Sequence, residues 1–314
     1  MEGILGNTRT VEKETNWEER ERKTQKGMEE SHGKAVVIEE ERKWEEMNKD
    51  CLVKVFEVVG LESLILDVPF VCKSWYNASL DPQCWKNLTF PKLGGWPSSP
   101  FMERYMDEYH ADKFSVTGFI KFVVDRSCKS SVKLVLPGCC SLEAFAYVSN
   151  ECPSLQVIGL PSELVVSGEN HILEFVSKWS ELRYLYLGTI LNCFKEILTQ
   201  ISLNCKNFSG LGTKGYIDNE AALAIATQLP KIKYLHLKNS SLPRESLVTI
   251  LEGCKELVEL DVRNCIGFEA DDEEILMLAS HIKRFKPEGS EIYEDWWFDE
   301  HISSRDVDSD AGSD

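Results

Sequence analysis

The sequence contains no apolar run long enough to cross a membrane. A spanning helix needs about 20 predominantly apolar residues. The N-terminal region is rich in Glu, Lys and Arg, and it also lacks the apolar stretch of a signal peptide. We therefore expect a soluble, intracellular protein without a membrane partner.

The eleven cysteines and six histidines lack the spacing of a metal site. There is no Cys-x-x-Cys pair, the adjacent Cys139 and Cys140 have no partner at zinc-ligand spacing, and no His-Glu-x-x-His motif occurs. A disulfide scaffold is typical of short secreted chains, which this chain is not. We expect reduced thiols in a packed core, no metal and no cofactor. No Ser-His-Asp or Cys-His arrangement has local support, so we also expect no catalytic residues and no enzyme activity.

Basic residues are too few to balance the acidic ones, and the net charge is -17. Residues 287–314 alone contain ten acidic side chains against one basic side chain. Such a chain repels phosphate backbones, and no basic stripe offsets this repulsion. We therefore expect no nucleic-acid partner.

Both ends of the chain are highly charged. Residues 1–43 alternate Glu with Lys and Arg and predict a disordered tail, with a partner-binding helix as the alternative. Residues 287–314 predict a second, acidic tail that is mostly disordered. Within it, the aromatic segment Tyr293–Phe298 is either a short linear motif or a cap over the end of the folded domain.

Residues 44–90 predict a small helical unit. Its first helix carries an apolar stripe at spacings of three and four, formed by Leu52, Val55, Phe56 and Val59. Asn48 is suited to cap the start of this helix. Residues 91–113 begin with a run of Pro, Gly and Ser that favours a linker.

The strongest pattern is an internal repeat of the form Leu-x-x-Leu-x-Leu. Its central positions recur at intervals of 24 to 27 residues, inside the window of about 20–29 residues of leucine-rich repeats. These positions are Leu134, Ile158, Leu185, Leu211, Leu235, Leu260 and Phe285. The segments between them, including those beginning near Phe194, Glu220 and Glu245, have helical spacing. The pattern predicts an α/β fold over residues 114–286, a right-handed leucine-rich-repeat solenoid with parallel strands inside and helices outside.

Each predicted strand buries its central residue, so the neighbouring side chains face the concave side of the solenoid. Aromatic and charged side chains of both signs gather there, which favours protein recognition over an ordinary solvated sheet face. The candidate substrate-binding residues are Tyr184, Tyr186, Lys214, Tyr234, His236, Lys238, Glu259, Asp261 and Arg263.

The segment Gly210–Gly215 matches Gly-x-Gly-x-x-Gly, but Leu211 and Thr213 already occupy inward strand positions of the repeat. A dinucleotide loop would have to follow a strand and open a helix. We therefore expect no dinucleotide here. The glycines are expected to leave space on the concave face for a ligand or a bulky partner side chain.

Residues 44–90 resemble an F-box. The resemblance rests on Trp44-Glu45-Glu46, on Leu52-Val-Lys-Val-Phe56, on Val71-Cys72-Lys73-Ser74-Trp75, and on Asp81-Pro82 with Trp85. The Leu-Pro pair that usually opens the first helix is Met47-Asn48 in this chain. Together with the repeats, residues 44–286 resemble plant-type F-box/LRR-repeat proteins with cysteine-containing repeats.

The resemblance implies a three-helix F-box that docks on a Skp-family adaptor and, through it, on a cullin scaffold. The repeats would then hold a protein substrate for ubiquitination, in the nucleus and/or the cytoplasm. Residues that match the motif, and so are implied to contact the adaptor or shape that surface, are Met47, Leu52, Val55, Phe56, Leu64, Val71 and Trp75. The alternative is a leucine-rich-repeat scaffold or inhibitor that acts outside a ubiquitin ligase.

Overall fold

The computed structural model describes residues 44–94, 99–167, 169–190 and 192–292. The chain divides into two compact units between Leu211 and Gly212. Both predicted tails lie largely outside the described residues, including the whole of residues 1–43 and Tyr293–Phe298. No helix of the described part is both long enough and apolar enough to cross a membrane.

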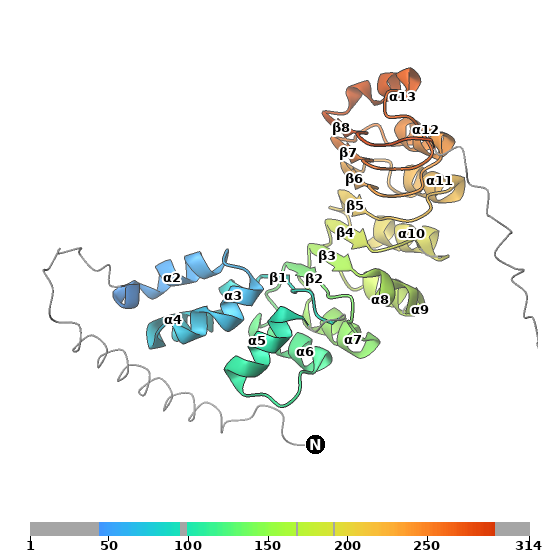
Figure 1. Ribbon diagram of the computed structural model, residues 1–314. Helices are drawn as coiled ribbons and strands as arrows, with labels where there is room; N and C mark the ends of the chain where they lie inside the picture. Colours follow the sequence, from blue (N-terminus) through green and yellow to red (C-terminus); the bar gives the residue numbers. More distant parts are fainter. Residues whose placement is uncertain (1–43, 95–98, 168, 191, 293–314) are drawn as a thin grey trace, which may run out of the picture. The chain divides into compact units, whose positions relative to one another are not determined.

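The first unit begins with short helices and continues with alternating strands and helices (Figure 1). Its helices and helical turns are η1 (Trp44–Glu46), α2 (Lys49–Phe56), α3 (Leu61–Leu66), η2 (Val68–Phe70), α4 (Lys73–Ser79), η3 (Pro82–Trp85), α5 (Pro100–Tyr109), α6 (Val116–Arg126), α7 (Leu142–Glu151), α8 (Ser162–Ser167), α9 (Glu169–Val176) and α10 (Phe194–Asn204). Its strands are β1 (Asn87–Thr89), β2 (Lys133–Val135), β3 (Val157–Leu160) and β4 (Tyr184–Leu187), and β5 (Gly210–Gly212) lies at the division between the units.

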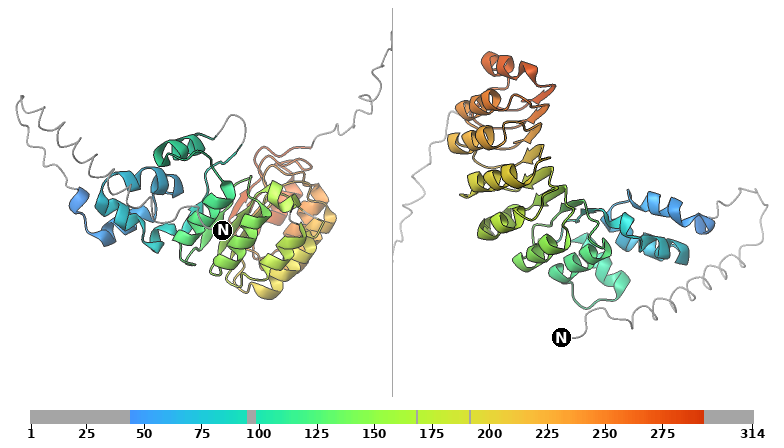
Figure 2. Two further views of the ribbon diagram at one scale, coloured as in Figure 1. Left: turned by 90° about the horizontal axis from the view of Figure 1, so that it is seen from below. Right: turned by 180° about the vertical axis from the view of Figure 1, so that it is seen from behind.

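The second unit repeats the same strand-and-helix arrangement. Its elements are α11 (Asn219–Gln228), β6 (Tyr234–His236), α12 (Arg244–Gly253), β7 (Glu259–Asp261), α13 (Glu273–Leu278), η4 (Ala279–His281) and β8 (Arg284–Lys286). In the repeats of each unit the helices lie on one side and the strands on the other (Figure 2). The helices expected near Phe194, Glu220 and Glu245 are α10, α11 and α12.

The repeat positions read from the sequence are the positions that pair across the parallel strands. In the first unit Leu134 pairs with Ile158 and Ile158 with Leu185. In the second unit Leu235 pairs with Leu260 and Leu260 with Phe285. All of these side chains except the partly exposed Phe285 are fully buried. The predicted α/β fold with parallel leucine-rich repeats is therefore confirmed.

The sequence pattern missed the first strand. Strand β1 lies inside the segment predicted as a helical unit, and its Leu88 pairs with Leu134. The two residues are 46 positions apart, far outside the repeat interval, because α5 and α6 both lie between them. The end of the helical segment is thus already the first strand of the sheet.

The predicted linker over residues 91–113 contains helix α5 and is not a loop throughout. Pro100 is compatible with the first turn of a helix, since its missing N–H would have no intrahelical partner there. Arg104 of α5 pairs with Asp67 at 2.8 Å, and the Tyr109 hydroxyl donates to the Ile65 carbonyl at 2.8 Å. The helix therefore packs against the N-terminal helices, and the Pro/Gly/Ser run is confined to the residues before it.

Three helices of the repeats end at a buried cysteine, namely Cys152, Cys205 and Cys254. The Cys205 thiol donates to the carbonyl of Trp179, the corresponding residue of the preceding repeat, at 3.3 Å. Burial raises the pKa of Cys152 to about 12 and the pKa of Cys205 and Cys254 to about 11. These thiols are protonated at neutral pH, and they serve as small core groups.

Two asparagines that follow repeat strands adopt a left-handed backbone. Asn239 and Asn264 have φ values of 58° and 52°, a region in which asparagine is tolerated better than most residues. The side-chain amide of Asn264 donates to Asn239 Oδ1 at 3.3 Å. The two side chains thus bond to each other, while the backbone N–H of Asn239 donates to the Arg263 carbonyl.

We predict that Leu260→Ala lowers the free energy of unfolding by about 2–5 kcal/mol, because it leaves a cavity at the centre of β7. Leu223→Ala is the matched control, since Leu223 is exposed on the surface of α11 and its truncation should change stability by no more than about 0.5 kcal/mol. Urea unfolding followed by circular dichroism measures both. Equal effects would contradict the central position of Leu260 in the repeat core.

Candidate interaction surfaces

The N-terminal helices divide the predicted adaptor-binding residues into a buried set and an exposed set. Leu52, Phe56 and Leu64 are at most 2% exposed. Val55 is 46% exposed and Val71 is 50% exposed. The first set therefore shapes the packing of α2 and α3, and only the second set is open to a partner.

Met47 and Trp75, the other two predicted residues, are half-buried. The Trp75 ring packs edge-on against Phe56, with 5.3 Å between ring centroids. Its indole N–H donates to the carbonyl of Trp44 at 3.2 Å. Trp75 thus holds η1 next to α4, and this contact helps to keep the Trp44 side chain at the surface.

Asn48 begins α2 by a different means from the proline that the resemblance leads one to expect. Its side-chain oxygen accepts a hydrogen bond from the Asp50 N–H at 2.8 Å. This bond satisfies one of the four N–H groups that a helix start leaves without partners. The cap predicted from the sequence is therefore confirmed.

Sequence reasoning missed two exposed apolar residues of this region. Val58 is 82% exposed and Trp44 is half-exposed. Val58 follows Val55 by three positions, a spacing that places two side chains on the same side of a helical turn. This spacing is the sequence signal from which the exposure of Val58 beside Val55 could have been predicted. We call Trp44, Val55, Val58 and Val71 the apolar helical surface. These residues come from η1, the end of α2 and the turn before α4. Helices α2 and α4 pack side by side (Figure 1).

The first repeats hold the N-terminal helices through backbone and side-chain bonds. The Val132 N–H, directly before β2, donates to the Lys86 carbonyl at 2.9 Å, and the Phe90 N–H donates to the Val135 carbonyl of β2 at 3.1 Å. On the other side, Phe70 packs edge-on against Tyr109 of α5. The apolar helical surface is therefore part of the same compact unit as the first repeats.

Two predicted substrate-binding residues, Tyr184 and Tyr186, lie on β4 of the first unit. Tyr186 is exposed, whereas the Tyr184 ring is half-buried against Gly210. A Cβ at residue 210 would overlap this ring. The space that Gly210 provides is thus filled by Tyr184, which corrects the expectation that it is left for a ligand or a partner side chain.

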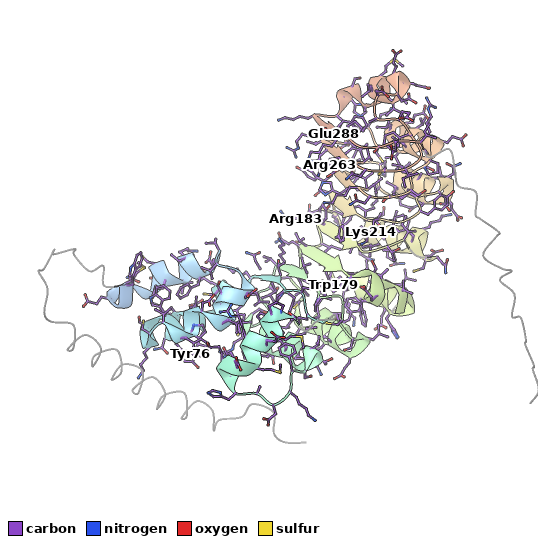
Figure 3. The ribbon with its side chains drawn as sticks, viewed as in Figure 1. Tyr76, Trp179, Arg183, Lys214, Arg263 and Glu288 are labelled. Atoms are coloured by element: carbon purple, nitrogen blue, oxygen red, sulfur yellow. The ribbon has the colours of Figure 1, made fainter. Side chains whose placement is uncertain are left out.

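The remaining seven predicted substrate-binding residues lie on or next to the strands of the second unit. The register places His236 beside Asp261 and Asp261 beside Lys286, while Tyr234, Glu259 and Arg284 form the parallel row. We call this region the C-terminal strand face, and it includes two basic residues and one acidic residue that the prediction omitted. Its members are Lys214, Tyr234, His236, Lys238, Glu259, Asp261, Arg263, Arg284, Lys286 and Glu288; Figure 3 labels Lys214, Arg263 and Glu288. The weak repeat match around Phe285 was the signal for the omitted residues.

Glu259 lies at the centre of an ionic cluster. Its carboxylate accepts hydrogen bonds from Arg284 at 2.6 Å and from Lys286 at 2.6 Å. These bonds, the one from Lys286 above all, lower the pKa of Glu259. His236 Nε2 lies 3.6 Å from the same carboxylate, but burial is the larger influence and lowers the pKa of His236.

Asp261 is buried and paired with the residue two positions further on. The Arg263 guanidinium donates to its two carboxylate oxygens at 2.9 and 2.7 Å. This fork geometry holds the pKa of Asp261 below its ordinary value of 3.8. Glu259 and Asp261 are therefore already paired within the chain. Lys214 and Lys238 are exposed and make no ion pair with another described residue.

No group of three or more His, Cys, Asp or Glu side chains in the described part of the chain is arranged to hold a metal ion. No catalytic arrangement is built from the residues above. What the two surfaces offer is contact: apolar side chains on one, and aromatic and charged side chains on the other.

No family model matches the sequence, but known proteins match it over most of its length. An F-box/LRR-repeat protein of Arabidopsis thaliana is 29% identical over 70% of this chain and 72% of its own length. F-box protein FBW2 of the same plant is 27% identical over 74% of this chain and 71% of its own length. This chain is an F-box/LRR-repeat protein.

A third relative, F-box protein SKIP1 of Arabidopsis thaliana, is 23% identical over 77% of this chain and 84% of its own length. The likeness extends over most of each protein, so it includes more than a shared repeat. The F-box of this F-box/LRR-repeat protein corresponds to the helices that carry the apolar helical surface, and its LRR strands carry the C-terminal strand face.

We predict that Asp261→Asn destabilises the chain at pH 7 and has a smaller effect at pH 3. The folded-state pKa of Asp261 is depressed, so its stabilisation is present above about pH 3.8 and is lost as the pH falls through the folded value. Urea unfolding of both chains at the two pH values measures the difference. A difference that does not change with pH would show that the Arg263 pair does not stabilise the ionised carboxylate.

Proposed function

We propose that this F-box/LRR-repeat protein is the substrate-recognition subunit of an SCF-type ubiquitin ligase and has no catalytic activity of its own. The F-box would dock on a Skp-family adaptor, which connects it to a cullin scaffold. The leucine-rich repeats would hold a target protein for ubiquitination. The observation that carries the proposal is the apolar helical surface of the F-box, which sits on the same compact unit as the first repeats.

The apolar helical surface supports the docking step. Four apolar side chains between 46% and 82% exposed remain on a segment whose core is otherwise well buried. Each exposed apolar Å² that a partner covers contributes about 25 cal/mol to association before the costs of binding. Single exposed apolar residues are ordinary, but a set on one small segment favours a protein-binding role.

The packing of α5 supports a rigid connection between docking and recognition. Arg104 pairs with Asp67, Tyr109 bonds to the Ile65 carbonyl, and β1 is continuous with the F-box helices. A substrate held by the first repeats would keep a fixed position relative to the adaptor. Such positioning matters for group transfer, because a fixed geometry replaces a search by diffusion.

The strand faces support the recognition step. Tyr186 on the first unit and Tyr234 on the second present aromatic rings next to charged side chains. Aromatic and arginine side chains carry much of the binding energy in protein interfaces. The substrate is therefore proposed to be a protein.

We predict that Val58→Asp combined with Val71→Asp weakens binding to a Skp-family adaptor by at least about tenfold, because each change places a charge in an apolar interface. Both residues are exposed, so the fold should be unaffected. Val166→Asp on α8 is the matched control, being 66% exposed and outside the F-box. Biolayer interferometry with immobilised adaptor measures the affinity. Wild type that binds no better than the double variant would favour a leucine-rich scaffold that acts outside a ubiquitin ligase.

We predict that Tyr234→Ala combined with Lys238→Ala reduces substrate capture and leaves adaptor affinity unchanged. Both side chains are on the C-terminal strand face, which belongs to a different compact unit from the F-box. Proximity labelling in cells, with the biotin ligase fused to the N-terminus, compares the labelled proteins with those of wild type and of Leu223→Ala. Labelling that is the same for all three chains would place substrate recognition elsewhere.

A further inference from the structure

The C-terminal strand face differs in charge from the rest of its unit. Residues 212–292 contain ten basic and fourteen acidic side chains. The strand face holds five of the basic residues and three of the acidic ones, so the remainder of the unit holds five basic and eleven acidic residues. The strand face is therefore net positive and the rest of the unit net negative, in a chain whose overall charge is -17.

Two basic residues of this face, Lys214 and Lys238, stand outside its internal ion pairs. Glu259 is engaged by Arg284 and Lys286, and Asp261 by Arg263. Lys238 and Lys214 have no such partner among the described residues, and both are exposed. The Thr213 N–H donates to the His236 carbonyl, so the residues that follow β5 run beside those that follow β6. Lys214 and Lys238 therefore lie on neighbouring strands of the face.

The acidic residues of the unit are concentrated at a different place, around the starts of the helices. Asp218 caps α11 and Asp272 caps α13, where Glu273 and Glu274 follow directly. Negative side chains at these ends are stabilised by the helix dipole and by the free N–H groups. They repel any further acidic segment that approaches the same edge.

The chain supplies such a segment. Ile292, the last described residue, lies beside this acidic edge, where its N–H donates to Glu269 at 3.2 Å. The next 22 residues contain eight acidic side chains and one basic one, and Tyr293, Trp296, Trp297 and Phe298 are among the first six. The eight residues from Tyr293 to Glu300 reach about 26 Å when extended, whereas Lys214, which follows β5, is three strands away from β8, or about 14 Å.

We propose that the acidic, aromatic segment of residues 293–300 binds the C-terminal strand face of its own chain, with its carboxylates on Lys214 and Lys238. The aromatic side chains of the segment lie against Tyr234 and the stem of Lys238. Repulsion at the helix starts and attraction at the strand face act in the same direction. Because the segment is tethered, its effective concentration at the face is in the millimolar range, so even weak contacts are populated.

Zero-length carbodiimide coupling of the full-length chain tests this contact, since it joins only carboxylates and lysines that touch. We expect mass spectrometry to find links from Glu294, Asp295, Asp299 or Glu300 to Lys214 and Lys238. Their yield should exceed that at Lys231 and Lys255, control lysines of the same unit, by about tenfold, in line with the local concentration of a tethered segment. Raising the salt from about 0.15 M to about 1 M, which shortens the screening length from about 8 to about 3 Å, should abolish the preference.

Two variants and an isotope control complete the test. Lys214→Arg with Lys238→Arg keeps the charge but cannot form the amide, so the links should disappear. The chain's own segment should still occupy the face of this variant, so an added synthetic peptide of residues 293–314 should not bind. Lys214→Glu with Lys238→Glu should release the segment and increase its hydrogen exchange. A mixture of heavy and light chains should give links within one chain only.

Links spread evenly over all exposed lysines, or links mainly between heavy and light chains, would overturn the proposal. Unchanged exchange of residues 293–300 in the charge-reversed chain would overturn it as well. None of these outcomes depends on adaptor binding or on ubiquitination. One consequence does rest on the proposed function: the segment would cover the face assigned to the substrate, so a chain with Glu294→Gln, Asp295→Asn, Asp299→Asn and Glu300→Gln should capture more substrate.

Discussion

The burial of one apolar side chain at the centre of each repeat strand is the constraint on which the rest of the structure depends. A single strand and helix cannot bury its apolar residues alone, so each repeat must stack on a neighbour. Ile158, Leu185, Leu235 and Leu260 are fully buried by this stacking. Because side chains alternate along a strand, the same constraint turns the residues on either side toward the strand face. The strand face is thus a direct consequence of the core.

The strand face of the second unit shows how a charged surface is organised on such a scaffold. Neighbouring strands are about 4.8 Å apart, so charges in register interact at close range. Glu259 consequently lies against two basic residues of β8, and Asp261 is held by Arg263. These pairs hold Glu259 and Asp261 within the chain. The exposed Lys214 and Lys238 remain outside these pairs, which is why contact with a partner is proposed there.

The F-box illustrates how a small helical unit combines a core with a binding surface. Its length is near the limit at which a segment can form a core of its own. Strand β1 and helix α5 remove this difficulty, because both join the F-box to the first repeats. Apolar residues that would otherwise be needed for the core, such as Val58 and Val71, can then remain at the surface.

The sequence by itself determined the repeat, its register and the fold class, because the burial of Leu-type residues at a constant interval leaves a periodic signal. It also determined which strand residues face outward, and the cap at Asn48. Only the tertiary structure decided which apolar residues of the F-box are core and which are surface, since both kinds satisfy the same helical spacing. It alone revealed β1, whose distance from β2 breaks the period, and helix α5, whose Pro, Gly and Ser neighbours favour a loop. It likewise decided that Tyr184 fills the space at Gly210 and that Glu259 is paired, because these contacts join residues 25 to 27 positions apart. The pairing of Asp261 with Arg263 depends on how the two side chains are oriented and buried.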